Sequence, residues 1–165
     1  MSTEEPRVRW LSSEERAAWL AVAALIVKLP SALDAQLQED EGLSFFEYMV
    51  LAVLSEQADR TLQMTDIASA ASASLSRLSH TVKRLEAQGL VRRDRLPGPG
   101  RRTTATLTDL GYRKVARSAP SHVQRVRELL IDAISPEQLR TLRDIGDRVL
   151  ERIDPDRYCP TVDQA

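Results

Sequence analysis

SLSRLSHTVKRLEAQGL (residues 74–90) and the VRRDRLPGPGRRTTATLT that follows it (residues 91–108) combine the pattern of a helix with that of a β-hairpin. The first half of this stretch has apolar residues at helical spacing, which predicts a helix that begins near Ser74 and ends at Gly89. The face expected to pack inward consists of Leu75, Leu78, Val82 and Leu85. The second half has two runs rich in β-forming residues around the turn LPGPG (96–100), so we expect a β-hairpin.

Further helices are predicted on both sides of this stretch. Ser12 with Glu15, and Ser44 with Glu47, have the spacing of a capping box ahead of apolar residues. The short helix opened by Thr65 and the helix from Ser74 are separated by a tight turn, as in a helix-turn-helix. The expected helices, besides that from Ser74, span about 12–39, 44–57, 65–68, 108–133 and a last segment from 135.

The predicted fold class is mainly α with a small β-hairpin. The helix over 12–39 is apolar on nearly every side, and the last helix carries a stripe of apolar residues from Leu139 to Ile153. This surface exceeds what a small central lobe can cover, which favours an interface with a second copy of the chain. We expect residues 44–107 to form the lobe, and residues 1–43 and 108–165 to form a helical dimerisation region.

Charge is distributed unevenly along a chain whose net charge is only −1. Residues 1–60 hold 5 basic and 11 acidic side chains, residues 61–107 hold 8 and 3, and residues 108–165 hold 10 and 10. The middle third is therefore the strongly positive part of the chain, which is typical of a region that binds nucleic acid.

Composition indicates a cytoplasmic protein. A length of 165 residues with 42% apolar residues suits one domain or two small lobes that share a core. A single cysteine, Cys159, excludes a disulfide within one chain. The longest apolar run, 17–27, has 11 residues, whereas a membrane span needs roughly 20. The N-terminus lacks the pattern of a signal peptide.

The outer face of the helix from Ser74 is small, polar and cationic. It holds Ser76, Ser79, His80 and Lys83, with Arg77 and Arg84 at its flank. Serine lets a helix approach base edges closely, while arginine and lysine donate to guanine or to phosphates. A solvated helix face explains this helix alone equally well.

The hairpin favours the nucleic-acid interpretation. It gathers five arginines with only Asp94 to offset them, namely Arg92, Arg93, Arg95, Arg101 and Arg102. Such a cluster repels itself unless an anion neutralises it, and DNA phosphates would do so. A merely soluble hairpin is the alternative. Helix and hairpin together predict duplex DNA as the partner, read in the major groove and in a neighbouring minor groove.

Nearly the whole chain resembles the MarR family of bacterial winged-helix transcriptional regulators. The resemblance rests on landmarks in the right order, LSFFEYMVLAVLSE (43–56), MTDIASAASASLSRLSHTVKRLEAQGLVRR (64–93), PGRRTTATLTDLGYRKV (99–115) and SPEQL (135–139). It implies a winged helix-turn-helix lobe and an obligate-type homodimer joined by the terminal helices. It also implies that two lobes read a pseudo-palindromic site, and repression is favoured because occlusion of a promoter requires only binding.

The resemblance also implies roles for individual residues. Ser76, Ser79 and His80 fall at base-facing positions, with Arg77, Lys83 and Arg84 as base or phosphate contacts. The family's wing tip usually has Asp-x-Arg, which Pro99, Gly100 and Arg101 match, so Arg101 keeps the minor-groove position without its usual aspartate. The full candidate DNA-binding set is Ser74, Ser76, Arg77, Ser79, His80, Lys83, Arg84, Arg93, Arg95, Arg101 and Arg102.

Family members often respond to phenolic or amphipathic ligands held between the dimerisation region and the lobe. Trp19, Phe45, Phe46 and Tyr48 are the aromatic residues near the expected cleft, with Trp19, Phe45 and Tyr48 as the candidate ligand residues, although core packing is the commoner reason for aromatic residues at helical spacing. The two histidines, His80 and His122, lie on separate helices without ligands at metal spacing, so we expect no metal and no cofactor, and place His122 at a surface or interface.

An enzyme is not expected. The sequence has no phosphate loop, nucleophile elbow or catalytic carboxylate pair with a histidine partner. The alternative to a DNA-binding regulator is a dimeric ligand-sequestering or protein-interaction module with a degenerate winged helix, an alternative that rests on Pro99 alone.

Overall fold

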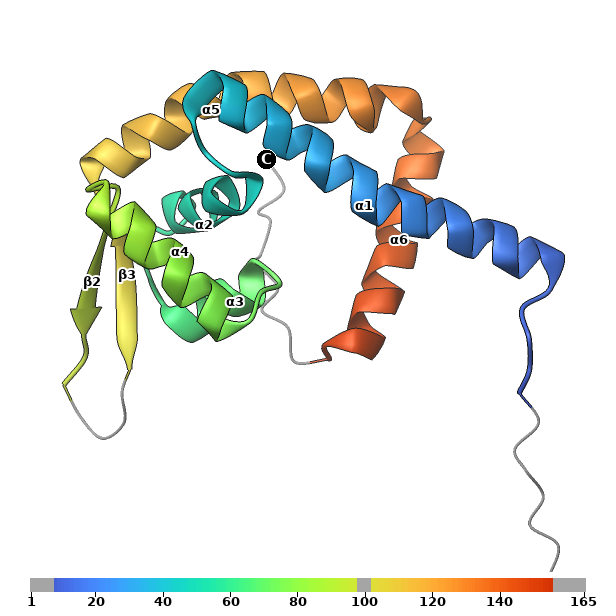
Figure 1. Cartoon of the computed structure of the whole chain (residues 1–165), viewed down its shortest axis with the longest axis horizontal. Coiled ribbons are helices and arrows are strands. Elements are labelled where there is room, and N and C mark those ends of the chain that lie inside the picture. The colour runs from blue at the N-terminus through green and yellow to red at the C-terminus, as the bar shows by residue number, and fades with distance from the viewer. Residues whose placement is uncertain (1–7, 98–101, 156–165) are drawn as a thin grey trace, which may run out of the picture.

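A computed structural model of the chain describes residues 8–97 and 102–155, which form several helices and a small antiparallel sheet at one end of the molecule (Figure 1). This confirms the predicted fold class. The elements follow the chain in the order α1 (Ser13–Glu41), α2 (Phe45–Ser55), β1 (Thr61–Gln63), α3 (Met64–Ala70), α4 (Leu75–Ala87), β2 (Val91–Arg95), β3 (Thr103–Leu107), α5 (Asp109–Leu129), a 3-10 turn (Ile131–Ala133) and α6 (Pro136–Ile153).

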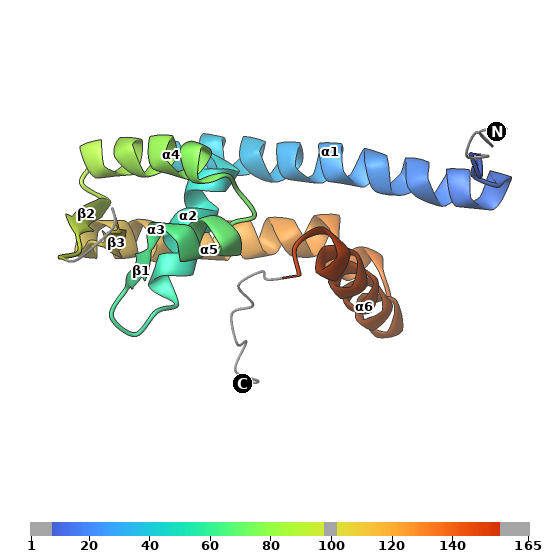
Figure 2. The ribbon, with the colours of Figure 1, turned by 90° about the horizontal axis from the view of Figure 1, so that it is seen from below.

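The molecule is a lobe with two long extensions. The lobe consists of α2, α3, α4 and the sheet, and α5 passes beside the C-terminal part of α1 (Figure 1). Figure 2 shows α1 continuing far beyond the lobe, while α6 turns away from the end of α5. Two helices, α1 and α6, therefore project away from the lobe.

Local capping explains why the observed helix starts agree with those predicted from the sequence. In α1, α2 and α6 the N-cap serine and the third helical residue bond reciprocally, in the pairs Ser12–Glu15, Ser44–Glu47 and Ser135–Gln138. The Ser74 and Thr108 hydroxyls cap α4 and α5. Each cap lies within three residues of its partner, so sequence spacing was sufficient to place it.

The strand β1 was not predicted. Its three residues pair with β3 from Thr61 opposite Thr106 to Gln63 opposite Thr104, which gives the sheet order β1-β3-β2. Such a short strand has too few residues to show alternation. The helix that follows it begins at Met64 rather than Thr65, and Gln63 at its N-cap makes no side-chain cap bond.

The core of the lobe joins α2, α3, α4 and the sheet to the end of α1. Its fully buried side chains include Leu37, Leu51, Leu54, Ile67, Leu78, Val82 and Leu85. Leu75, which was predicted to pack inward with the last three, is instead 50% exposed. It is the first residue of α4 and extends past the edge of the core, so the helical pattern was right and its first position was wrong.

Two glycines shape the path of the chain around the hairpin, Gly89 between α4 and β2 and Gly111 in the first turn of α5. Gly89 has φ +71° after the end of α4, a conformation that side chains with a Cβ rarely adopt. At Gly111 an added Cβ would lie 2.2 Å from the carbonyl oxygen of Leu90 and 2.6 Å from Cδ1 of Leu107. The backbone of α5 can therefore approach the start of β2 only because residue 111 has no side chain.

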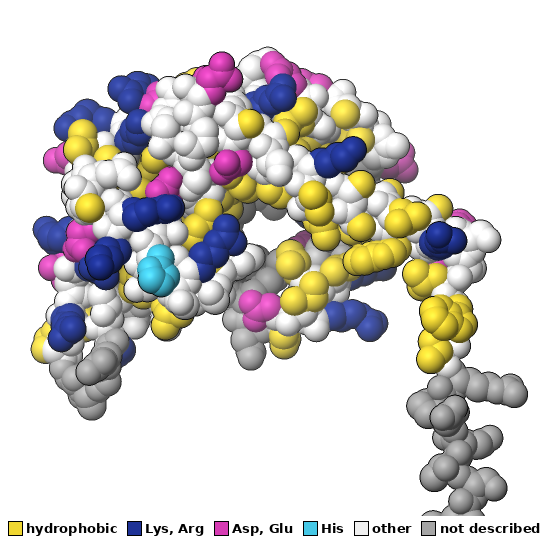
Figure 3. Space-filling view, in the orientation of Figure 1, with side chains coloured by type: hydrophobic (Ala, Val, Ile, Leu, Met, Phe, Trp, Pro, Cys, Tyr) yellow, Lys and Arg dark blue, Asp and Glu magenta, His cyan; other side chains and the backbone are white. Residues whose placement is uncertain are grey.

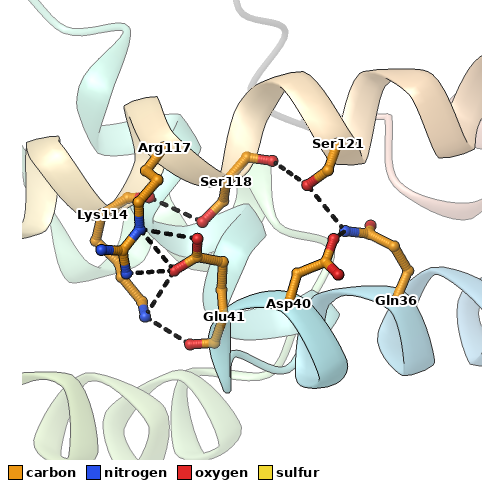
Figure 4. Close-up of polar contacts among 7 residues, drawn as sticks. All are labelled: Gln36, Asp40, Glu41, Lys114, Arg117, Ser118 and Ser121. Atoms are coloured by element: carbon orange, nitrogen blue, oxygen red, sulfur yellow. Dashed lines mark hydrogen bonds and ion pairs between the residues drawn. The ribbon is translucent and has the colours of Figure 1, made fainter.

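Polar side chains fasten the end of α1 to α5 (Figure 4). The Arg117 Nε donates to Glu41 Oε1 at 2.8 Å, and the Lys114 Nζ lies 3.0 Å from Glu41 Oε2. The hydrogen bond from Arg117 first, and that from Lys114 with it, hold the pKa of Glu41 below its ordinary value against the opposing effect of burial. These contacts fix the path along which α1 leaves the lobe.

His122 lies inside this junction rather than at a surface. Its ring is 8% exposed and packs 4.4 Å from the ring of Tyr48 and 5.9 Å from that of Phe45, between centroids. Burial lowers the pKa of His122. The expectation of a surface or interface position was wrong because α2 packs across α5 at this point, a contact that sequence spacing does not show.

Large apolar side chains remain exposed along both extensions. Figure 3 shows hydrophobic atoms running along α1 away from the lobe, and no residue of α6 is buried. The exposed set includes Trp19, Leu20, Val22, Leu25, Ile26 and Val27 on α1, and Leu142, Ile145, Val149, Leu150 and Ile153 on α6. By length and composition alone, α1 is also a helix that could cross a membrane, although its run 17–27 is too short by itself.

Candidate nucleic-acid interface

The face of α4 that was predicted to read DNA is exposed along its whole length. Lysine and arginine side chains gather over α4 and the strands in Figure 3. The exposed positions are Ser74, Ser76, Arg77, Ser79, His80, Lys83 and Arg84. The Ser74 hydroxyl accepts a hydrogen bond from the Arg77 backbone N–H at 3.2 Å, so this side chain also serves as the N-cap.

Two arginines of this face are held by the first turn of α2. The Arg77 guanidinium lies 4.2 Å from the centre of the Phe46 ring, a cation–π distance. The Arg84 Nη2 lies 3.0 Å from Oε1 of Glu47, whose other oxygen accepts the Ser44 backbone N–H. These contacts of Phe46 and Glu47 with α4 were not predicted, because they bridge 31 and 37 positions of the chain.

The arginines of the hairpin are more strongly paired than the sequence suggested. Arg93 donates to Glu86 through Nε at 2.9 Å and through Nη2 at 2.6 Å. These hydrogen bonds are the main reason that the pKa of Glu86 lies below its ordinary value. Arg92 donates to Asp94 at 2.8 Å. The expectation that Asp94 alone offsets the cluster was therefore wrong, since Glu86 on α4 also contributes.

The remaining hairpin arginines are exposed where the structure describes them. Arg95 and Arg102 are exposed on the two sides of the turn. Arg101, the predicted minor-groove contact, lies with Pro99 and Gly100 outside the described residues. Of the arginines predicted to bind DNA, Arg95 and Arg102 thus have no carboxylate within ion-pair distance in the described part of the hairpin.

A small cavity of about 210 Å³ lies between α4, the start of α3 and the hairpin. Its lining includes Met64 and Thr65 from α3, Leu75 and Ser79 from α4, and Arg102 beside β3. It therefore opens within the surface that carries the predicted DNA contacts.

A larger cavity of about 1090 Å³ lies between α1, α2 and α4. Phe45, Phe46 and Met49 contribute apolar surface to it, Arg77, Lys83 and Arg84 contribute cations, and His80 contributes its imidazole ring. Of the aromatic residues expected near a ligand cleft, Phe45 and Phe46 line this cavity. Phe45 also packs against His122, as Tyr48 does, whereas Trp19 is 55% exposed on α1. The α4 residues of the lining were not predicted to border a ligand cavity, because the cavity forms between helices distant in the sequence.

The described residues hold no group of three or more His, Cys, Asp or Glu side chains that could bind a metal ion. His80 is exposed on α4 and His122 is buried on α5. Neither histidine is thus part of such a group within the described ranges.

Comparison with known proteins agrees with this geometry. The model of the MarR family matches residues 41–102, which span α2 to the hairpin. No curated protein sequence matches the chain. Among solved structures, the chain is 41% identical to Sco3205 of Streptomyces coelicolor, a MarR family transcriptional regulator crystallised in complex with DNA. That alignment covers 93% of this chain and 95% of Sco3205, with a TM-score of 0.86.

Two further structures show how far the similarity extends. AbsC, a MarR family transcriptional regulator from Streptomyces coelicolor, is 34% identical over 90% of this chain and 100% of its own, with a TM-score of 0.83. BpsR of Bordetella bronchiseptica, whose DNA binding is regulated by 6-hydroxynicotinic acid, shares the fold at 18% identity, with a TM-score of 0.70 over 82% and 98% of the two chains. From its winged helix-turn-helix lobe and this identity over nearly its whole length, the chain belongs to the MarR family of transcriptional regulators.

Proposed function

We propose that the chain is a homodimeric transcriptional regulator that binds duplex DNA through α4 and the β2–β3 hairpin. The observation that carries this proposal is the exposed polar and cationic face of α4 beside the hairpin, in a chain 41% identical to Sco3205, which was crystallised with DNA. In this arrangement α4 lies in the major groove and the hairpin reaches the neighbouring minor groove.

The contacts between α2 and α4 support two different roles for the side chains on this face of α4. Arg77 and Arg84 are held in place by Phe46 and Glu47, so little side-chain freedom is lost when they meet phosphates. The serines between them, Ser76 and Ser79, are short enough to bring the helix backbone close to base edges. The arginines therefore position the helix, and the smaller side chains meet the bases.

The exposed apolar surface of α1 and α6 supports a homodimer. Contiguous apolar surface of this kind marks an interaction site, because leaving it in water is unfavourable. A second copy is the occupant that we propose. A bilayer is a poorer fit for α1, because its last turns carry Leu33 and Leu37, which are buried against the rest of the chain. The dimer presents two α4 helices to the two half-sites of a pseudo-palindromic DNA site. We propose that it does so in the cytoplasm.

We also propose that binding represses transcription and that a small amphipathic or phenolic ligand relieves it. The cavity of about 1090 Å³ is lined by the rings of Phe45 and Phe46 and by three cationic side chains of α4, Arg77, Lys83 and Arg84, which suits an aromatic acid. BpsR, which shares the fold, is regulated in its DNA binding by a hydroxylated aromatic acid. A ligand that engaged Arg77 or Arg84 would withdraw them from phosphate, and so lower the affinity for DNA.

The experiment that tests DNA binding is selection of duplexes from a random pool, followed by fluorescence anisotropy with the selected duplex. Lys83→Ala is expected to weaken binding to selected and random duplexes alike, because a phosphate contact does not depend on sequence. Arg125→Ala is the matched control, since Arg125 is a half-exposed cation on α5 paired only with nearby Glu128 among the described residues. It is expected to bind as the parent does.

Two results would contradict the proposal. If selection enriches no sequence, the winged helix does not read DNA, and the interaction-module alternative is favoured. If Lys83→Ala binds as tightly as Arg125→Ala, α4 is not the contacting helix.

A further inference from the structure

Leu75 is an apolar residue in a polar setting. It is the first residue of α4, follows Ser74 and precedes Ser76, and is 50% exposed although no other large apolar residue of α4 is exposed. The neighbouring α4 position toward the C-terminus on the same side is Ser79, four residues on, which was predicted to face bases. The inward packing that explains Leu78, Val82 and Leu85 therefore does not explain Leu75.

Leu75 forms one wall of the cavity of about 210 Å³, together with Met64 and Thr65 from the start of α3. Ser79 and Arg102 also line this cavity, so it is continuous with the surface that we propose to contact DNA. Met64 is 8% exposed and Leu75 is 50% exposed, so Leu75 is the more accessible of these two apolar residues. When α4 occupies a major groove, the N-terminal residues of such a helix are those that meet base edges.

Thymine is the base whose major-groove edge carries an apolar group, the C5-methyl. We propose that Leu75 and the cavity beside it bind the C5-methyl of one thymine in each half-site, so that Leu75 is a specificity-determining residue. This inference rests on the proposed function. It adds that the edge of α4 nearest the hairpin, where Leu75 lies, recognises a methyl group of the DNA. The positively charged rim at Arg102 suits the adjacent phosphate, which supports a nucleotide as the occupant.

Thymine and uracil differ only in the C5-methyl, which allows a direct test. Each thymine of a selected duplex is replaced in turn by deoxyuridine, and affinity is measured by anisotropy. For the parent protein, one thymine in a half-site is expected to show a loss of about fourfold, the factor that corresponds to burial of one methyl group. In Leu75→Ala that loss is expected to fall to less than about 1.5-fold, because the wall that buries the methyl is gone.

Two variants separate this role from a general defect. Leu75→Met keeps an apolar side chain of similar volume and is expected to retain the uracil effect. Leu110→Ala truncates a leucine of similar exposure, 48%, on α5 and is expected to retain it in full. Circular dichroism melting of each variant checks that it is folded.

The inference would be overturned if no uracil substitution changes the affinity of the parent, or if the sensitive thymine is equally sensitive in Leu75→Ala. Both results leave specific binding intact, so they refute the role of Leu75 without refuting DNA binding. Failure to select any duplex would refute the proposed function, and this inference with it.

Discussion

Replacing Gly111 by alanine is expected to destabilise the protein, although glycine to alanine within a helix normally stabilises by up to about 1 kcal/mol. Gly111 lies in the first turn of α5, where the N-cap Thr108 accepts its backbone N–H. An added Cβ would lie 2.2 Å from the Leu90 carbonyl oxygen, far inside van der Waals contact. That atom belongs to the backbone and accepts the Thr108 N–H at 3.1 Å, so it cannot move aside without breaking this bond.

The magnitude follows from these opposing effects. Overpacking of a well-filled site costs about 1–3 kcal/mol, and the backbone contact places Gly111→Ala at or beyond the upper end. After the gain in helix propensity, a net loss of about 2 kcal/mol remains. In a domain of this size that corresponds to a melting temperature lower by about 4–8 °C.

The assay is thermal unfolding followed by circular dichroism. Gly146→Ala is the matched control, because Gly146 also lies in a helix and an added Cβ there meets nothing within 4 Å of the single chain. It is expected to melt at or slightly above the temperature of the parent. If Gly111→Ala melts as high as Gly146→Ala, the close approach between α5 and the start of β2 is not a constraint, and the reasoning fails.

Three further predictions concern the junction of α1, α2 and α5 and the exposed helices. Because Arg117 and Lys114 lower the pKa of Glu41, the ion pairs stabilise the fold above the ordinary value of 4.5 and are lost as the pH falls through the lower folded value. Glu41→Gln should therefore cost about 1 kcal/mol in urea unfolding at pH 7, and the difference from the parent should shrink as the pH falls below 4.5. Burial lowers the pKa of His122, so the unfolded chain takes up a proton there first and stability falls as the pH drops below 6.5. His122→Phe should flatten that part of the melting-temperature profile, and an unchanged slope between pH 7.5 and 5 would show that His122 is not its source. Ile26→Asp, at a position 60% exposed in the single chain, should convert the homodimer that we propose to a monomer in light scattering, since a carboxylate cannot be buried unpaired. A dimer that persists in this variant would place the interface elsewhere than on α1.

The helices were largely predictable from sequence because their determinants are local. The Ser12–Glu15, Ser44–Glu47 and Ser135–Gln138 boxes each act within one helical turn, and Gly89 marks the end of α4 by its own backbone conformation. The residues on the outer face of α4 were also predictable, because the helical period of 3.6 residues is enough to assign each of them to that face.

What the sequence did not show depends on contacts between distant segments. Glu86 neutralises Arg93 because β2 folds back beside α4, and Glu47 reaches Arg84 because α2 crosses the end of that helix. His122 is buried because Tyr48 on α2 covers it. Leu75 fits the inward pattern by spacing, yet it lies beyond the last neighbour that could cover it. In each case a period along one helix carries no information about which other element lies above it.

The salt dependence of DNA binding measures how many phosphates the protein neutralises. We propose that α4 and the hairpin of each copy in a homodimer together neutralise several phosphates of a specific duplex. With six to ten phosphates neutralised, affinity for the selected duplex should fall by about 10³- to 10⁵-fold between 50 and 200 mM salt. Lys83→Ala should make the slope of log affinity against log salt shallower by about one unit for each phosphate that the variant no longer neutralises. Affinity that is unchanged across this range, or a slope that Lys83→Ala leaves as it is, would contradict the account.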